Sequence, residues 1–179
     1  MSALRLKAPI SLLVGALALM GTATSQGRYM EQEEFLKAAF PGAVPAPRTL
    51  WITNEIRDPV EALLGHSFGS LRVRYWAGGG KTAWVFDEIG KEKPITIGVT
   101  VRDDAIEMVR ILEFRETRGW EVRYPFFTDQ FTGARFVDGN HIDKRIDSIT
   151  GATLSVAAVM RVVHVALLLN DMTRSVARE

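Results

Sequence analysis

The pattern of apolar and polar residues predicts a β-rich centre followed by a long helix. Apolar and polar side chains alternate along residues 71–76, which is typical of a half-buried strand. The runs 82–86, 95–101 and 106–114 are rich in β-branched and aromatic residues and extend the pattern to four strands. Residues 154–169 instead repeat apolar side chains at helical spacing. Strands followed by a C-terminal helix predict an α+β fold with helices packed on an antiparallel sheet.

Short turns separate the predicted strands, so neighbouring strands are expected to run antiparallel. Gly78-Gly79-Gly80 lies between the first two strands. No Lys-Ser/Thr pair follows these glycines and no helix opens after them, so a hairpin turn is favoured over a phosphate loop. Asp103-Asp104 predicts a second tight turn, and Asp138-Gly139-Asn140 predicts a third.

The other segments of the chain complete a single compact domain. Residues 31–40 have the pattern of a short amphipathic helix, and residues 58–64 predict another. Two prolines make residues 43–48 extended without regular structure. Residues 122–127 are expected to be a further extended piece, and residues 130–133 a short helical turn. No repeat, low-complexity tract or composition shift divides the chain.

The N-terminus has the order of a secretory signal peptide. Arg5 and Lys7 precede an apolar run over residues 10–20, and small residues follow up to Ser25. The apolar run is shorter than the roughly 20 residues of a membrane-spanning helix. We therefore expect a signal peptide over residues 1–25 and export to the periplasm or the extracytoplasmic face of a membrane. An uncleaved membrane anchor is the alternative interpretation.

Composition excludes several kinds of chemistry. The chain has no cysteine, which rules out disulfides, a c-type haem attachment site and thiolate-bound iron–sulfur clusters. The three histidines are far apart and lack the spacing of metal ligands. The formal charge is +1, and residues 26–179 alone carry 20 basic and 21 acidic residues. A nearly neutral mature domain does not indicate a nucleic-acid partner.

The stretch 147–155, with the sequence DSITGATLS, joins a polar segment to the long C-terminal helix. Thr153 falls at or just before the predicted helix start. A threonine there can cap the helix, because its side-chain oxygen accepts a hydrogen bond from a free backbone N–H. The same exposed N–H groups and the helix dipole also favour a bound phosphate. Residue types alone leave a cap and an anion site open.

The same stretch resembles the flavinylation motif D-x-x-[ST]-G-A-T of FMN-binding domains. This family includes subunits of sodium-pumping NADH:quinone reductase and of Rnf-type electron-transport complexes. The resemblance implies that Thr153 carries FMN through a phosphoester bond. A Mg-dependent flavin transferase would attach the FMN, with FAD as the donor. Asp147, Thr150, Gly151 and Ala152 fill the other motif positions and are expected to belong to the cofactor site.

Three further segments are similar to the family. Residues 40–43 (FPGA) resemble a recurring start of single-domain members. Residues 109–117 (VRILEFRET) resemble the family strand that leads into a Glu-Thr pair. Residues 130–133 (QFTG) are similar to its Q-F-x-G element. The resemblance therefore covers most of residues 26–179, and implies one FMN-binding domain there.

The residues around the flavin ring are less defined by the motif. Glu116 and Thr117 are the candidates for polar contacts with the cofactor. A solvated loop carboxylate is the alternative for Glu116. Residues 118–121 read Arg-Gly-Trp-Glu where respiratory subunits often have Pro-Gly-Leu-Gly. Trp120 is expected to pack in the core rather than to cover the ring.

The function that this resemblance implies is electron transfer by an exported flavoprotein. The chain has no G-x-G-x-x-G after a strand, hence no sign of a nicotinamide site. It would relay electrons between redox partners in the membrane or periplasm, as a carrier rather than a self-sufficient enzyme. Two alternatives are an exported binding or assembly module without flavin, and an FMN-dependent reductase of a small acceptor.

Overall fold

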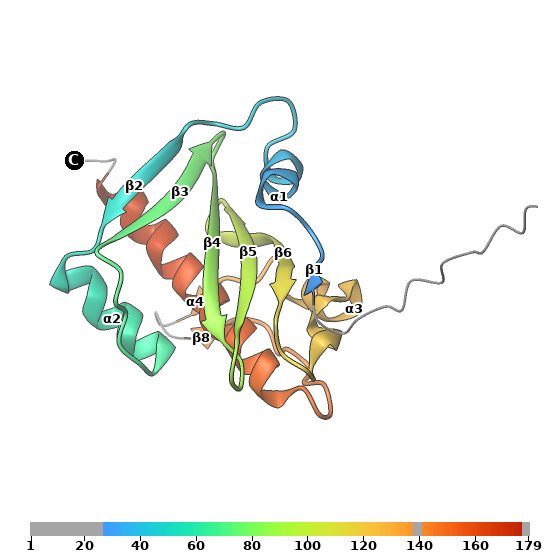
Figure 1. Cartoon of the computed structure of the whole chain (residues 1–179). Helices are drawn as coiled ribbons and strands as arrows, with labels where there is room; N and C mark the ends of the chain where they lie inside the picture. Colours follow the sequence, from blue (N-terminus) through green and yellow to red (C-terminus); the bar gives the residue numbers. More distant parts are fainter. Residues whose placement is uncertain (1–26, 138–140, 177–179) are drawn as a thin grey trace, which may run out of the picture.

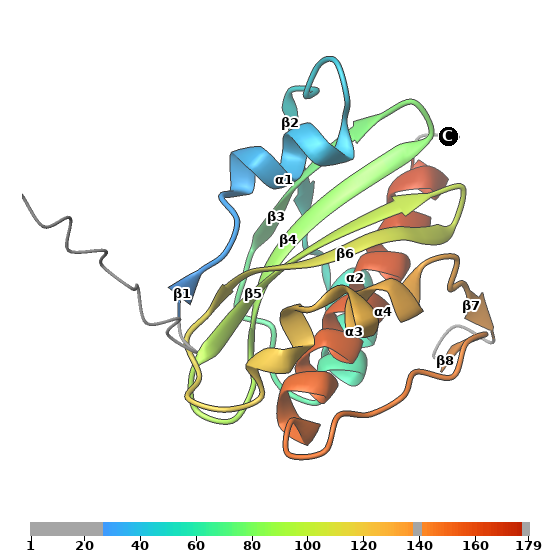
Figure 2. The same cartoon turned by 90° about the vertical axis from the view of Figure 1, so that its right-hand side faces the viewer.

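A six-stranded antiparallel sheet organises the molecule, in the order β1-β6-β5-β4-β3-β2. The structure, a computed structural model, describes residues 27–137 and 141–176. The strands of the sheet are β1 (Gly27–Arg28), β2 (Pro47–Trp51), β3 (Arg72–Gly78), β4 (Lys81–Ile89), β5 (Pro94–Arg102) and β6 (Ala105–Phe114). Helices α2 (Asn54–Leu64) and α4 (Thr153–Val176) cover one face, and α1 (Gln32–Ala39) covers part of the other (Figures 1 and 2). The prediction of a single α+β domain is confirmed.

The tight turns of the sheet follow the prediction. Gly79 and Gly80 have φ angles of +58° and +75° between β3 and β4. Asp103 and Asp104 have φ angles of +49° and +65° between β5 and β6. Two positive φ angles define a type I′ turn, which matches the twist of a two-residue hairpin. The predicted turn at 138–140 lies outside the described residues, as does the predicted leader at 1–25.

Two segments near the start of the chain are more regular than expected. Residues 47–51 form β2, because Pro47 lies at the start of an edge strand, where proline removes no inner ladder hydrogen bond. Helix α2 begins at Asn54, four residues before the predicted start, and carries Pro59 inside it. Gly65 ends this helix in the left-handed conformation that is common for glycine at helix C-termini.

The prediction of an extended piece at residues 122–127 is wrong. The chain there forms the 3-10 helix η1 (Trp120–Arg123), the short helix α3 (Pro125–Thr128) and a second 3-10 turn, η2 (Asp129–Phe131). Pro125 starts α3, a position where its missing N–H costs nothing. Val122, Phe127 and Phe131 are fully buried from these short elements. A small hairpin of β7 (Phe136–Val137) and β8 (His141–Ile142) follows.

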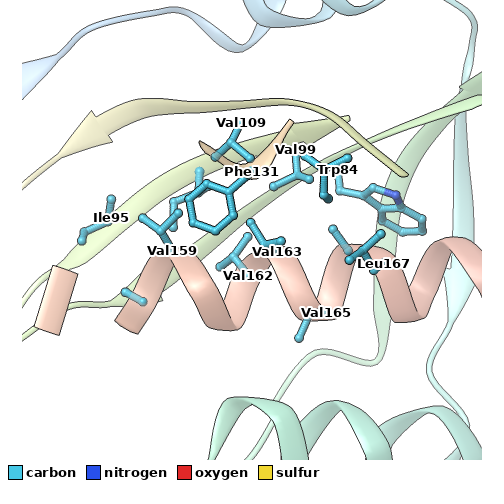
Figure 3. Close-up of a cluster of buried hydrophobic side chains, with 14 of the residues drawn as sticks. Trp84, Ile95, Val99, Val109, Phe131, Val159, Val162, Val163, Val165 and Leu167 are labelled. Atoms are coloured by element: carbon cyan, nitrogen blue, oxygen red, sulfur yellow. The ribbon is translucent and has the colours of Figure 1, made fainter. Parts of the chain in front are cut away.

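Helix α4 forms the main core together with the sheet. Ile95, Val99 and Trp84 on the strands face Val159 and Val163 on the helix (Figure 3). The helix is the one element of the described residues that is long and apolar enough to cross a membrane. Its most apolar part is 56% buried between the sheet and α2, as expected for the core helix of a globular domain.

A smaller core lies under α1 on the opposite face of the sheet. Phe35 of α1 is fully buried against Gly98 of β5. A Cβ atom at Gly98 would lie 2.8 Å from the Phe35 ring, so only glycine leaves room for the aromatic side chain. The predicted amphipathic helix at 31–40 therefore packs as its apolar face indicates.

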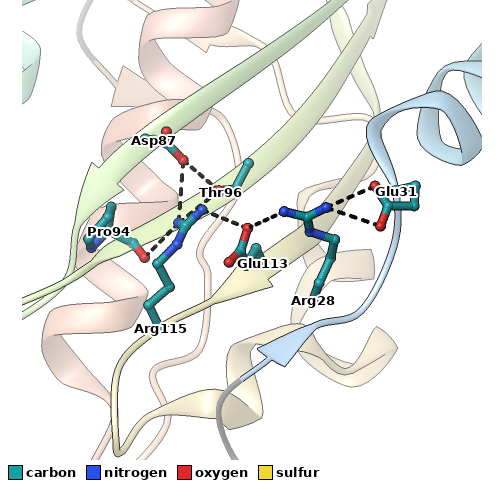
Figure 4. A network of polar contacts seen from close by, with 7 residues as sticks. All are labelled: Arg28, Glu31, Asp87, Pro94, Thr96, Glu113 and Arg115. Carbon is teal, nitrogen blue, oxygen red and sulfur yellow. Dashed lines mark hydrogen bonds and ion pairs between the residues drawn. The ribbon is translucent and has the colours of Figure 1, made fainter.

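An arginine network ties the ends of the central strands together on the α1 side. Arg115 donates hydrogen bonds to Glu113 (2.6 Å), Thr96 (3.0 Å) and the Pro94 carbonyl (3.2 Å) (Figure 4). Its guanidinium also lies 3.6 Å from Asp87 of β4. These contacts hold the residue directly before Glu116 in a defined position on β4 and β5.

A second polar cluster joins α2, β4 and α4 on the other face. The buried Glu88 carboxylate accepts a hydrogen bond from Arg161 Nε at 2.7 Å. His66 Nε2 lies 3.1 Å from the same carboxylate, and His66 Nδ1 lies 3.1 Å from the Ser67 carbonyl. The hydrogen bond to Ser67 and the contact with Glu88 together raise the pKa of His66. A protonated histidine thus strengthens this junction.

Candidate functional site

The start of α4 is set by a glycine turn. The Ala152 N–H donates to the Ile149 carbonyl at 3.0 Å, and Gly151 between them has a φ of +84°. This is the geometry of a type II turn, which requires glycine at its third position. The structure shows that Gly151 is needed for its backbone conformation, since no atom would contact a Cβ there within 4 Å.

Thr153 is the first residue of α4 and does not cap it. Ala152 precedes it, and the Ala152 carbonyl accepts the first helical hydrogen bond, from Val156 at 2.9 Å. Alanine has no side-chain acceptor for the free amides of the first turn. In the described part of the chain, neither the exposed Thr153 hydroxyl nor the N–H groups of residues 153–155 have a hydrogen-bond partner. The interpretation of Thr153 as a plain cap is therefore wrong.

The loop after β6 packs directly on this helix start. Gly119 is buried, has a φ of +84°, and lies against Ser155 and Ala152. A Cβ atom at Gly119 would lie 2.4 Å from Ser155 Oγ and 3.4 Å from the Ala152 Cα. Gly119 was not among the predicted site residues. Its contact with α4 joins residues far apart in the sequence, so only the fold shows it.

Glu116 organises the β4–β5 turn from inside the same region. One carboxylate oxygen accepts backbone hydrogen bonds from Lys91 (2.5 Å), Glu92 (2.6 Å) and Lys93 (2.9 Å). Burial alone would raise the pKa of Glu116, but these three N–H donors outweigh it and the net pKa is lowered. Glu116 is therefore a charged, buried carboxylate and not the solvated loop residue that the sequence left open.

These elements meet around a pocket of about 350 Å³ at one end of the molecule. The pocket brings together five predicted site residues, namely Glu116, Thr117, Gly151, Ala152 and Thr153. Lys91, Glu92, Arg118, Leu154 and Ser155 complete its lining. In Figures 1 and 2 the β4–β5 turn and the start of α4 lie at this same end. Its volume is within the range of small-molecule sites.

Asp147 and Thr150 do not line this pocket. Both side chains are exposed, and Asp147 makes no ion pair with any described residue. The backbone of Asp147 is nevertheless fixed, because its N–H donates to Gln130 Oε1 at 2.7 Å. Gln130 also donates from Nε2 to the Phe126 carbonyl at 3.2 Å. The glutamine of the QFTG element thus connects α3 to the first residue of the motif.

The aromatic residues beside the loop pack on one another. Trp120 is half-buried against the core and meets Tyr124 edge-on at 5.6 Å. The Arg123 guanidinium lies 4.9 Å from the Trp120 ring and 4.3 Å from the Tyr29 ring. Trp120 does not line the pocket, in accord with the packing role expected for it.

The described residues contain no group of three His, Asp or Glu side chains that could hold a metal ion. The fold and the pocket define an α+β domain that presents an accessible threonine at an uncapped helix start. The sequence model of the FMN-binding domain family matches residues 90–168 of this chain, from the β4–β5 turn to α4. Residues 90–168 thus match the FMN-binding domain family, and the predicted resemblance is confirmed. A search of curated proteins found no match.

Proposed function

We propose that the protein is an exported electron-transfer flavoprotein with FMN linked to Thr153 through a phosphoester. The observation that carries this proposal is the accessible, unpartnered Thr153 hydroxyl at an uncapped helix start, inside the segment that matches FMN-binding domains. The free N–H groups of residues 153–155 and the positive end of the α4 dipole suit a phosphate group. The residues present therefore fit the phosphate end of FMN.

The attachment step balances with FAD as the co-substrate of a Mg-dependent flavin transferase. The Thr153 Oγ–phosphorus bond forms, the pyrophosphate bond of FAD breaks, and AMP leaves while the hydroxyl loses its proton. The exposure of Thr153 and of Asp147 supports access by such an enzyme. Bound FMN would supply one- and two-electron transfer chemistry, and the protein would set its position and surroundings. A redox partner in the membrane or periplasm would exchange the electrons.

Export is proposed from the leader pattern in residues 1–25. A covalent link suits that location, because a cofactor lost outside the cytoplasm is not readily replaced. The extent of the domain over residues 26–179 is likewise a prediction, since the family match spans residues 90–168.

Coexpression with a flavin transferase tests the attachment. Intact mass and peptide mapping should find one FMN on the peptide that contains Thr153, and Thr153→Ala should abolish it. Because the hydroxyl makes no hydrogen bond among the described residues, Thr153→Ala should change the free energy of unfolding by less than about 0.5 kcal/mol. Ser148→Ala is the matched control, since it removes a nearby hydroxyl outside the pocket.

An unmodified wild-type peptide would contradict the proposal and favour a binding or assembly module without flavin. Rapid oxidation of the reduced holoprotein by small acceptors, with no partner protein present, would favour a reductase over a carrier. Covalent FMN on the Thr153→Ala variant would refute the assignment of the acceptor.

A further inference from the structure

The pocket beside Thr153 is lined by two positively charged residues, Lys91 and Arg118. Of these, Arg118 forms no ion pair with any described residue. Its side chain is exposed and lines the same pocket as Thr153, and it has no ion pair or hydrogen bond with any described residue. The neighbouring Glu116 carboxylate does not pair with Arg118, because it accepts hydrogen bonds from the three backbone amides of the β4–β5 turn. Arg118 therefore carries a positive charge into the pocket without a partner from the protein.

The other positively charged residue of the pocket, Lys91, does have a counter-ion in the protein. Lys91 Nζ lies 3.4 Å from Glu92 Oε1, so this exposed pair is internally balanced. Glu92 also lines the pocket. Lys91 thus provides a comparison residue of the same charge and exposure, in the same pocket, but with its own counter-ion.

The position of Arg118 relative to Thr153 is fixed by its neighbour. Gly119 packs against Ala152, directly before α4, and against Ser155 in the first turn of the helix. The Arg118 backbone is therefore held beside the helix start, while its long side chain stays free to reach an anion. Arginine suits this task because its planar fork can bind two oxygens of one phosphate group.

We propose that Arg118 binds the phosphodiester of the FMN on Thr153 and holds the cofactor's phosphate end against the start of α4. The inference rests on the proposed function, and it adds a positioning residue at a place where this chain departs from the respiratory subunits. The phosphodiester carries one negative charge, which Arg118 matches. Arg118 acts on the linkage and not on the flavin ring.

The test compares flavinylated and unflavinylated forms of wild type, Arg118→Gln, Arg118→Lys and the control Lys91→Gln. Thermal unfolding of the two forms gives the rise in Tm on FMN attachment for each protein, a readout that does not depend on electron-transfer activity. In Arg118→Gln this rise should be smaller than in wild type by about 3 °C, and in Lys91→Gln it should be unchanged. At 1 M NaCl the rise should fall in wild type and in Arg118→Lys, because salt screens an exposed ion pair.

Equal Tm rises in Arg118→Gln and wild type would overturn the inference, and so would a wild-type rise that salt does not change. A wild-type rise that salt does not change overturns the inference even where Arg118→Gln accepts no FMN. Absence of FMN on wild-type Thr153 would instead overturn the proposed function. The two failures are therefore distinguishable.

Discussion

Gly119→Ala would disturb the contact between the loop after β6 and the start of α4. The new methyl group meets two obstacles. Residue 119 has a φ of +84°, a conformation that costs an L-residue about 1–2 kcal/mol. The Cβ atom would also lie 2.4 Å from Ser155 Oγ and 3.1 Å from Ser155 Cβ. Rotation of the hydroxyl relieves the first contact but not the second.

The expected loss of stability follows from adding these terms. Overpacking a close contact costs about 1–3 kcal/mol, so together with the conformational cost Gly119→Ala should lower the free energy of unfolding by about 2–5 kcal/mol. Gly65→Ala is the matched control, because Gly65 has a φ of +74° with no atom within 4 Å of the added Cβ. It should lose only the conformational part, about 1–2 kcal/mol.

Urea unfolding of the proteins without FMN measures the free energy of unfolding of both variants. The double mutant Gly119→Ala/Ser155→Ala isolates the contact between residues 119 and 155. Ser155→Ala should recover about 1 kcal/mol in the Gly119→Ala background, since it removes the closest atom. A Gly119→Ala variant as stable as Gly65→Ala would refute the packing argument. So would a Ser155→Ala change that has the same effect in both backgrounds.

Three further outcomes are expected. Glu116→Ala should lower the free energy of unfolding by about 2–3 kcal/mol at pH 7, because three amides lose a charged acceptor. The pKa of Glu116 is lowered, so in urea titrations the part of this difference that comes from the charged carboxylate should be full above its ordinary pKa of 4.5 and be lost as the pH falls through the folded pKa. The pKa of His66 is raised, so its contact with Glu88 should stabilise the protein fully below pH 6.5. This stabilisation should be lost as the pH rises through the folded pKa of His66. The variant His66→Gln should lack this part of the dependence of Tm on pH. Gln130→Ala should slow flavin attachment, followed by intact mass, with little change in Tm, because it frees the backbone of Asp147; an unchanged rate would contradict its positioning role.

The sheet and α4 could be predicted because their periodicity reflects burial. Residues 95–101 alternate between the two faces of the sheet, whereas 106–114 do so with two register shifts against β5, and both segments form strands with the expected turn between them. The prediction for residues 122–127 failed because Val122, Tyr124 and Phe126 stand at alternate positions, as in a strand. In the fold the buried residues are Val122 and Phe127. They reach the core from two short helical elements, and pattern alone does not separate these cases.

The acceptor could be proposed from sequence because the motif is local. Gly151 sets a turn between its own neighbours, and Thr153 follows at the helix start. The residues that surround Thr153 in the pocket could not be predicted in the same way. Glu116 binds amides about 23–25 residues away, and Gly119 packs on a helix 33 residues or more further along the chain. Such contacts depend on the register of the sheet and the placement of α4.

The buried course of α4 bears on the order of events in maturation. The helix that begins at Thr153 continues through the main core, and Ala152 directly before it is buried in the same core. The turn itself is local, but its position in the molecule is fixed only when the sheet and α4 have assembled. Under the proposed function, an enzyme that recognises this shape would act on a folded substrate, so FMN attachment would follow folding and would also report that folding has succeeded.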